Sequence, residues 1–477
     1  MPRQLICLAA AALCACADID PVLLQHHVIG ARADGTAIDV LGSREPLVDA
    51  KGSFHELMTQ ADLVCDAAAA EMAPADVTKP KRKLLIHVHG GLNSHDTALE
   101  SATKATRKMQ KEKVWADWHY PIFLVWPSGL FSSYWQSIWT HRRGEEWTLL
   151  GPITMPFVFV ADVLTAVARA PKNLVYMLAL DAGTALETVD WNSFPTWRHA
   201  RRIAENAAAN GFSLQLGEQR HSGWYYTGIG TAYVLTLPTK LVSELVIDTI
   251  GTHGWELMLH RCYNVFRRPS EFETGNDTTL EDRPSGAFGQ FFAELDQHIR
   301  EQRELGHEYE VTLVGHSMGA IVLNEALRSF PDLPVDHIVY MAAACTVQDA
   351  QDAVVPVVLD RKAAGKPCTF HMLTLHPLAD AGEAQWFVAD VPARGSLLEW
   401  IDNWFGNPAS SSQRVLGKWV NAVRGLHLFA AIRDHMTLRG FGYDGVPPQA
   451  HGEFNDCEFW RHSFWWPEAT TPTATGR

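Results

Sequence analysis

The sequence has no excess of positive charge and no block of like charges. Lys and Arg number 40 against 54 Asp and Glu, which leaves a formal net charge of −14 over 477 residues. A chain without a basic stretch has no general electrostatic attraction to nucleic acid or to anionic lipid. We therefore expect no nucleic-acid partner.

The cysteines form no recognisable framework. Five of the eight are scattered singly from Cys65 to Cys457, without the paired spacing of a zinc site or of a disulfide-stapled domain. Most of them are expected to be buried thiols. The sequence gives no indication of a cofactor, and we expect none.

Internal repeats and long low-complexity segments are also missing, and only 20 % of the residues are charged against 47 % that are hydrophobic. Such a composition excludes a disordered or fibrous protein. The length suits either several domains or one α/β core with a large insertion. Nothing in the composition indicates an oligomeric state.

The N-terminus has the pattern of an export signal. One positive charge at Arg3 precedes an uncharged, apolar run from Leu5 to Ala17, which is too short to span a bilayer. Leu13-Cys14-Ala15-Cys16 resembles a bacterial lipobox, in which cleavage precedes a cysteine that receives lipid. Residues 1–16 are thus interpreted as a leader, with Cys16 as the lipidation site. This predicts an exported protein of the bacterial cell envelope, tethered to membrane and facing the periplasm or the exterior.

Apolar strands and helices alternate in two separate parts of the chain, 22–128 and 286–465. The pattern predicts strands at 28–29, 37–40, 83–89, 121–126, 309–314, 337–344, 369–375 and 426–432, and helices at 54–72, 97–113 and 288–304. Continuous apolar strands are typical of a parallel sheet that is covered on both faces. We expect a doubly wound α/β core with a mainly parallel sheet.

Residues 129–285 interrupt this alternation and predict a helical insertion that acts as a cap or lid. Two strongly apolar helices are expected, one at 149–168 and one after Pro238. On the second helix Lys240, Glu244 and Asp248 form a narrow polar stripe, so most of its circumference must be buried or face lipid or ligand. Burial within the insertion is the interpretation favoured here. The last residues, 466–477, are expected to form a disordered tail.

One motif carries a specific chemistry. Gly315-His316-Ser317-Met318-Gly319 directly follows an apolar strand and directly precedes a helix. This context is that of a nucleophile elbow, in which Gly315 and Gly319 leave room for the turn and the Ser317 hydroxyl is pushed outward. The N–H of Met318, at the N-terminus of the helix, is a candidate donor to an oxyanion.

A second glycine motif ends an earlier strand. In His87-Val-His89-Gly90-Gly91-Leu92, glycines allow the backbone to approach a substrate, and the amides of Gly91 or Leu92 are candidate oxyanion donors. His-x-His at a strand end can also begin a zinc site, but no downstream ligand set accompanies it. We therefore expect no metal, and His87 is interpreted as a packed strand histidine.

With these motifs the chain resembles the α/β-hydrolase superfamily, and is most similar to bacterial serine esterases and lipase-like members. The resemblance covers about 81–128 and 290–456. It implies the α/β-hydrolase fold, with an acid after a late strand and a histidine after the last strand. For the acid, Asp380 follows the strand at 369–375, and Asp349 is the alternative.

Several histidines follow the last predicted strands. His451 lies in a turn-rich segment that resembles the His-Gly-x-Phe loop of such hydrolases and is preferred, with His435 as the alternative. The resemblance implies a serine hydrolase that cleaves ester bonds through a Ser317–His451–Asp380 triad. The apolar helices of the insertion, interpreted as an acyl-binding cap, favour hydrophobic or lipid-like substrates. Acyl transfer on the same triad, and an inactive lipoprotein that acts as a binding module, remain as alternatives.

Overall fold

The computed structural model describes twelve parts of the chain. They are residues 18–77, 79–91, 93–129, 133–135, 141–142, 145–146, 151–187, 195–216, 223–267, 286–383, 395–442 and 447–466. Three features predicted from the sequence lie outside the described residues: the leader with Cys16, Leu92, and the tail beyond residue 466.

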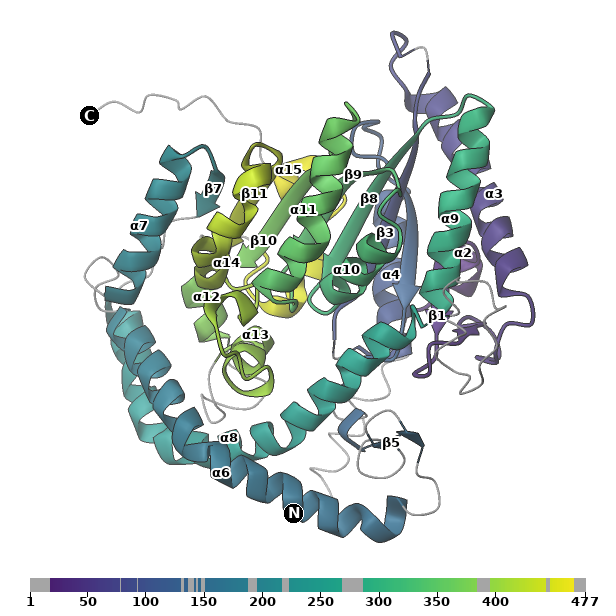
Figure 1. Ribbon diagram of the computed structural model, residues 1–477. Helices are drawn as coiled ribbons and strands as arrows, with labels where there is room; N and C mark the ends of the chain where they lie inside the picture. Colours follow the sequence, from purple (N-terminus) through teal and green to yellow (C-terminus); the bar gives the residue numbers. More distant parts are fainter. Residues whose placement is uncertain are drawn as a thin grey trace.

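A sheet of nine strands runs through the centre of the molecule in the order β2-β1-β4-β3-β8-β9-β10-β11-β7 (Figure 1). Every neighbouring pair is parallel except β1 and β2. The strands are β1 (Val28–Ala31), β2 (Ala37–Ile38), β3 (Arg82–Val88), β4 (Tyr120–Val125), β7 (Ser213–Leu216), β8 (Tyr309–His316), β9 (Val335–Met341), β10 (Thr369–Leu375) and β11 (Met436–Phe441). The predicted α/β class with a mainly parallel sheet is confirmed.

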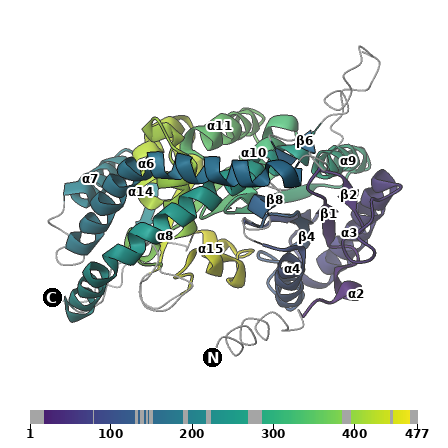
Figure 2. The ribbon, with the colours of Figure 1, turned by 90° about the horizontal axis from the view of Figure 1, so that it is seen from below.

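Helices cover both faces of this sheet. Figure 2 shows α10 and α11 on one side of it and α4 and α15 on the other. The helices outside the insertion are α2 (Pro21–Leu24), α3 (Ala50–Met72), α4 (His95–Met109), α9 (Ala287–Glu304), α10 (Gly319–Ser329), α11 (Val347–Ala363), α12 (Pro377–Gly382), α13 (Leu397–Trp400), α14 (Trp419–Gly425) and α15 (His462–Trp465). Short helical turns complete the core at η2 (Ile401–Phe405), η3 (Ser411–Gln413), η4 (Leu426–His435) and η5 (His451–Asp456). Double coverage explains why the central strands are mostly buried and rich in apolar residues, since neither face of the sheet meets water.

The prediction of a strand at 426–432 is wrong. These residues form the helical turn η4, and the last strand of this part of the chain, β11, begins only at Met436. The segment is short and apolar, and periodicity alone does not separate a buried helical turn from a strand of that length.

The insertion is not purely helical. It contains α6 (Gly151–Glu187), α7 (Pro195–Ala209) and α8 (Gly223–Asn264), the small hairpin of β5 (His141–Arg142) and β6 (Glu145–Glu146), and the strand β7. β7 pairs in parallel with β11 and so covers an edge of the central sheet. An exposed edge presents unpaired backbone groups, which this added strand satisfies.

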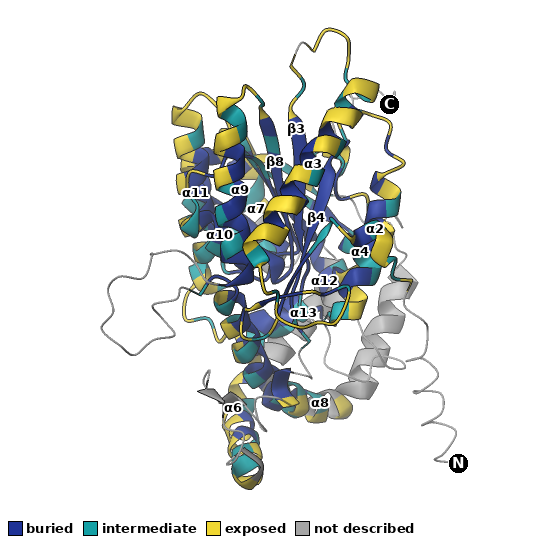
Figure 3. Ribbon diagram, turned by 90° about the vertical axis from the view of Figure 1, so that its right-hand side faces the viewer, coloured by how far each residue is buried: buried dark blue, intermediate teal, exposed yellow. Residues whose placement is uncertain are grey.

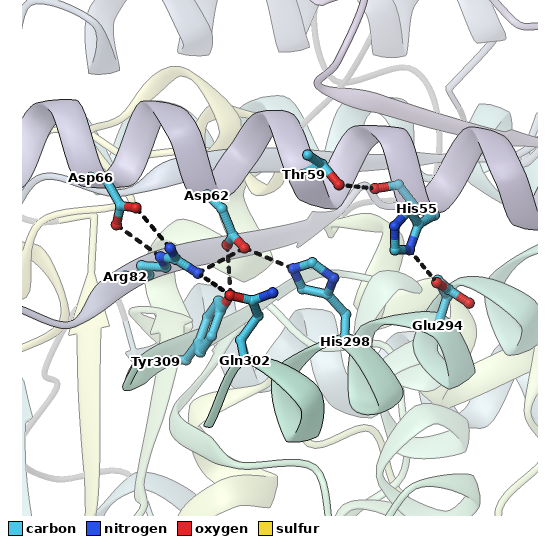
Figure 4. A network of polar contacts seen from close by, with 9 residues as sticks. All are labelled: His55, Thr59, Asp62, Asp66, Arg82, Glu294, His298, Gln302 and Tyr309. Carbon is cyan, nitrogen blue, oxygen red and sulfur yellow. Dashed lines mark hydrogen bonds and ion pairs between the residues drawn. The ribbon is translucent and has the colours of Figure 1, made fainter. Parts of the chain in front are cut away.

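A buried polar network holds the N-terminal ends of two central strands against α3 and α9 (Figure 4). Asp62 on α3 accepts hydrogen bonds from Arg82 (2.8 Å), from the Tyr309 hydroxyl (2.6 Å) and from His298 Nε2 (2.8 Å). Arg82 also makes a two-pronged contact with Asp66, at 2.8 and 2.7 Å. Asp62 is buried, whereas the side chain of Asp66 is 49 % exposed.

We predict that Asp62→Asn lowers the free energy of unfolding by about 2–4 kcal/mol, because three buried donors lose the carboxylate that they share. The matched variant Asp66→Asn, at the exposed end of the same network, should lower it by about 1 kcal/mol or less. Urea unfolding of both variants measures the difference. Equal effects would show that burial of Asp62 does not determine the strength of the network.

Candidate active site

Ser317 lies at the turn between β8 and α10 with its backbone in the left-handed region, at φ 51°. The turn is held from both sides. The Ser317 N–H donates to the Met341 carbonyl at the end of β9 (2.8 Å), and the Ala344 N–H donates to the Ser317 carbonyl (2.9 Å). A non-glycine residue in this conformation stores strain, which persists only where the surrounding structure enforces it.

The two elbow glycines are required by close backbone contacts. A Cβ at Gly319 would lie 2.1 Å from the Val88 carbonyl oxygen, and one at Gly315 would lie 2.8 Å from the Ala320 nitrogen. In both cases the obstacle is backbone, which cannot move aside as a flexible side chain can. The turn therefore packs directly against the C-terminal end of β3.

The expectation that the Ser317 hydroxyl faces outward is wrong for this structure. Ser317 is completely buried, and its Oγ has no hydrogen-bond partner. One covering group is the loop after β3. A Cβ at Gly90 would lie 2.8 Å from Ser317 Cβ, and a Cβ at Gly91 would lie 2.7 Å from Cε of Met258 on α8. The strand-end loop and the insertion helix thus close over the turn.

The peptide between Gly90 and Gly91 has a fixed orientation. The Gly90 carbonyl accepts from the Ser128 hydroxyl (3.0 Å) and from His89 Nδ1 (2.8 Å). The tautomer of His89 follows from its other nitrogen, because Nε2 accepts from the Trp126 N–H (3.1 Å). In a trans peptide the N–H points away from the carbonyl, so the Gly91 N–H points away from Ser128.

His451 follows β11 and lies beside the elbow. Its ring centroid is 5.0 Å from that of His316, the residue directly before Ser317. His316 Nε2 donates to the His451 carbonyl (2.9 Å), and His316 Nδ1 accepts from the Asn455 amide (3.0 Å). The elbow and the His451 turn are therefore joined through His316.

The imidazole of His451 itself makes no hydrogen bond, since neither Nδ1 nor Nε2 has a partner. The ring is buried, and burial lowers its pKa well below the ordinary value. It is therefore neutral at neutral pH, the state in which a nitrogen can accept a proton. No hydrogen bond links it to Ser317 Oγ in this structure.

His435 lies where the parallel strands begin, at the side of the sheet opposite to their C-terminal ends. It precedes β11, and the next residue, Met436, pairs with Phe370 near the beginning of β10. Ser317 follows the C-terminal end of β8, and parallel strands bring their C-terminal ends to one edge. The structure therefore brings His451 to His316, the residue before Ser317, and leaves His435 at the side of the sheet where the parallel strands begin.

Asp380, the preferred acid, lies in α12 after β10. It is buried, its carboxylate accepts a hydrogen bond from the Ser396 hydroxyl, and burial raises its pKa well above the ordinary value. The structure makes no hydrogen bond between Asp380 and His451. Of the described carboxylates, Glu383 contacts the histidine: its Oε2 accepts from the His451 N–H (2.8 Å), and burial raises its pKa to about 7.

The alternative acid, Asp349, has other partners. It lies in the first turn of α11, where Asn324 donates to one carboxylate oxygen (2.6 Å) and Arg328 pairs with the other. Both partners belong to α10, so this carboxylate ties two helices together. The structure does not bring it to His451.

In the part of the chain that the structure describes, no three His, Cys, Asp or Glu side chains are grouped to hold a metal ion. His87 is buried in β3 and packs on Phe459, with ring centroids 4.6 Å apart, and on Phe123. His89, directly after the end of β3, uses both ring nitrogens for backbone contacts.

Sequence reasoning missed three residues around the site. His316 was visible only as the variable position of the elbow, and Asn455 and Glu383 only as polar residues near the two candidate loops. The proximity of Asn455 to His451 in the same turn was the one signal that could have indicated it. Contacts from β8 to η5 depend on tertiary packing and leave no local pattern.

The site thus belongs to an α/β protein with a strained serine turn at the C-terminal edge of a parallel sheet. Comparison of the chain with protein-family models, with curated proteins and with solved structures gives no match. The site is therefore interpreted from its own geometry.

Four buried histidines make the site sensitive to acid. Burial lowers the pKa of His87 to about 3, of His89 and His316 to about 4, and that of His451 well below its ordinary value. The unfolded chain binds protons on these rings below pH 6.5, whereas the folded protein does not. The contribution of these neutral, buried rings to the free energy of unfolding is present above pH 6.5 and is lost as the pH falls towards 4.

We predict that His87→Leu makes the free energy of unfolding fall less steeply between pH 6.5 and about 4. The difference from the wild type should approach about 1.4 kcal/mol per pH unit, the effect of one proton. Urea unfolding of both proteins at several pH values measures it, and the matched slopes above pH 7 serve as the control. Parallel curves throughout would contradict the prediction.

Proposed function

We propose that the protein is a serine hydrolase of the α/β-hydrolase superfamily that cleaves carboxylic ester bonds. The observation that carries this proposal is the strained Ser317 at the β8–α10 turn, with a neutral, unpartnered His451 ring beside the adjacent residue. Strain of this kind concentrates at functional sites, and a strand–turn–helix context is that of a nucleophile elbow.

In the proposed reaction His451 accepts the proton of the Ser317 hydroxyl while Oγ forms a bond to the ester carbonyl carbon. The developing oxyanion is stabilised by the N–H of Met318, which precedes α10, and by the N–H of Gly91. The orientation of the Gly90 carbonyl towards Ser128 and His89 supports the role of Gly91. The proton then passes to the leaving alcohol, and water releases the acyl group.

A carboxylate is required to hold the His451 ring and to stabilise its charged form. We assign this role to Asp380, which follows β10 in the order Ser, Asp, His that is typical of the superfamily. Glu383 is the rival, because it already contacts the His451 backbone. Either carboxylate requires a reorientation of the imidazole, whose nitrogens are unpartnered.

The substrate is proposed to be hydrophobic or lipid-like. Met258 of α8 lies against the Gly91 side of the covered serine, so an acyl group entering there meets apolar side chains. The insertion would act as a cap, and entry of this group would require a local movement of α8 around Met258. The lipobox-like leader supports an exported, lipid-anchored protein, with Cys16 as the anchor.

Acyl transfer to an acceptor other than water is the second candidate. The complete burial of Ser317 favours it, because an acyl-enzyme that is kept from water survives until another acceptor arrives. Both reactions share the first half, so the experiments below apply to either.

We predict that a fluorophosphonate probe modifies the wild-type protein and fails to modify Ser317→Ala. The variant should also lose about four to six orders of magnitude in kcat on a short-chain ester. Intact-protein mass spectrometry measures the labelling. A wild-type protein that stays unlabelled, with the probe presented in detergent to open the cap, would favour the inactive binding module; equal labelling of both proteins would exclude Ser317 as the nucleophile.

A second prediction concerns the base. His451→Ala should lower kcat by about four orders of magnitude or more, whereas His435→Ala, at the far edge of the sheet, should stay within about twofold of the wild type. Initial rates on the same ester measure both variants.

The acid is assigned with a matched pair in the same assay. Asp380→Asn should reduce kcat by about four orders of magnitude, and Glu383→Gln by much less. The reverse order would transfer the role to Glu383. A full rate in the His451→Ala variant would refute the proposed pair of serine and histidine.

A further inference from the structure

The two long helices of the insertion, α6 and α8, lie side by side along one side of the core (Figures 1 and 2). We refer to the described parts of these helices as the α6–α8 arm. One side of the arm contacts the core at η2, where Gly251 of α8 packs on Phe405. The other side faces away from the protein.

Polar side chains lie between the two helices. Asp248 of α8 accepts from Asn173 (3.1 Å) and Thr252 (2.7 Å) and lies 3.8 Å from Arg169. Farther along, the Asp162 carboxylate pairs with His253 at 3.0 Å. The polar residues of α6 in these contacts are Asp162, Arg169 and Asn173, and their spacing places them on one face of the helix. Charged and polar side chains of α6 therefore face α8 in the described part of this contact.

On the opposite face of each helix, away from the contact between α6 and α8, the side chains are apolar and exposed. Phe157 is 76 % exposed and Ile153 is 67 % exposed. Figure 3 shows exposed positions along α6. The exposed apolar residues on the outward face are Ile153, Phe157, Val160, Leu164, Val167 and Val175 on α6 and Val242 and Val246 on α8. A water-soluble helix pair has the opposite arrangement, with apolar residues inside and polar residues outside.

We propose that the outward face of the α6–α8 arm binds the surface of a lipid bilayer. Inward polar residues and outward apolar residues are the arrangement that helices adopt in contact with lipid. The segment Ile153–Asn173 is long and apolar enough to cross a membrane, and only 11 % of its most apolar stretch is buried in the protein. A group of exposed large apolar residues of this kind marks an interaction site.

The arm lies in the plane of the membrane and does not cross it. α6 is followed by α7, which packs on α14, and by β7, which pairs with β11 of the central sheet. The far end of α8 is also held by the core, because Arg261 donates to the Pro127 carbonyl (3.1 Å) and to Ser133 Oγ (2.7 Å). Both ends of the arm thus return to one body, which a transmembrane path would divide.

The proposed attraction between the α6–α8 arm and the bilayer is apolar and not electrostatic. The net charge of −14 disfavours anionic lipid, so binding to neutral phosphatidylcholine should persist at about 0.5 M NaCl, where charge interactions are screened. The inference does not rest on the chemistry of Ser317, since lipid contact is measured without any turnover.

The test uses the full chain with phosphatidylcholine vesicles that contain a photoactivatable diazirine lipid, followed by peptide mapping of the adducts. Two lipids are compared, one with the diazirine near the headgroup and one at the end of the acyl chain. We expect adducts on 153–173 and 239–250, mainly from the shallow probe, and at least about tenfold fewer on α3 and α11.

Matched variants separate the arm from the leader. Phe157→Glu with Leu164→Glu should reduce the adducts on the arm by about tenfold or more, whereas Val48→Glu, at an exposed apolar residue elsewhere, should leave them unchanged. Circular dichroism and urea unfolding confirm that the variants fold.

Three results would overturn the proposal. Adducts confined to residues 1–17 would show that only the leader reaches lipid. Equal adducts from both probes at the middle of α6 would show that the helix crosses the bilayer. A dimer seen by light scattering without vesicles, lost in the Phe157→Glu and Leu164→Glu variant while the arm gains no adducts, would show that a second copy of the chain covers this face.

Discussion

The close contact between the end of β3 and the turn at Ser317 is the constraint on which the candidate site depends. No Cβ fits at Gly319 against the Val88 carbonyl, or at Gly90 against the side chains of Ser317 and His316, so the two strand ends meet only because both positions are glycine. This contact holds the serine in a conformation that an isolated turn would leave. It also brings the Gly90–Gly91 peptide next to the serine turn, and the proposed oxyanion role of the Gly91 N–H relies on that proximity.

Much of the core could be predicted from the sequence, because its signals are local. The strand at 369–375 has the predicted bounds, and the elbow glycines were identified from their spacing within one turn. The errors have physical causes of the same kind. Residues 426–432 are too few for periodicity to separate a strand from a helical turn. The strand β7 has only four residues, and it is a strand because it pairs with β11, which lies far away in the sequence.

The site itself was less accessible to sequence reasoning. The preference for His451 over His435 was an argument from a short motif, and the structure adds a topological reason, since one follows β11 and the other precedes it. The burial of Ser317 could not be foreseen, because the covering groups come from β3 and α8, far away in the chain. The same holds for the outward apolar face of α6, since composition predicts an apolar helix but not the direction of its side chains.

The polar network around Asp62 and the serine turn lie at opposite ends of the same strands. Arg82 begins β3 and Tyr309 begins β8, whereas Gly90 and Ser317 follow the C-terminal ends of these strands. The hydrogen-bonded network of Asp62 and Arg82 thus lies at one end of the strands, and the unpartnered Ser317 hydroxyl and His451 ring lie at the other. Hydrogen bonds that are already satisfied give rigidity, and those left open are available for a ligand.

The pairing of β7 with β11 has a geometric consequence. Because the strand that joins α7 to α8 is part of the central sheet, the arm cannot swing as a hinged flap without breaking backbone hydrogen bonds along that edge. Any flat surface that holds the arm therefore fixes the tilt of the whole sheet relative to that surface. The protein would diffuse laterally with one constant orientation, and the buried serine turn would keep a fixed distance from that surface.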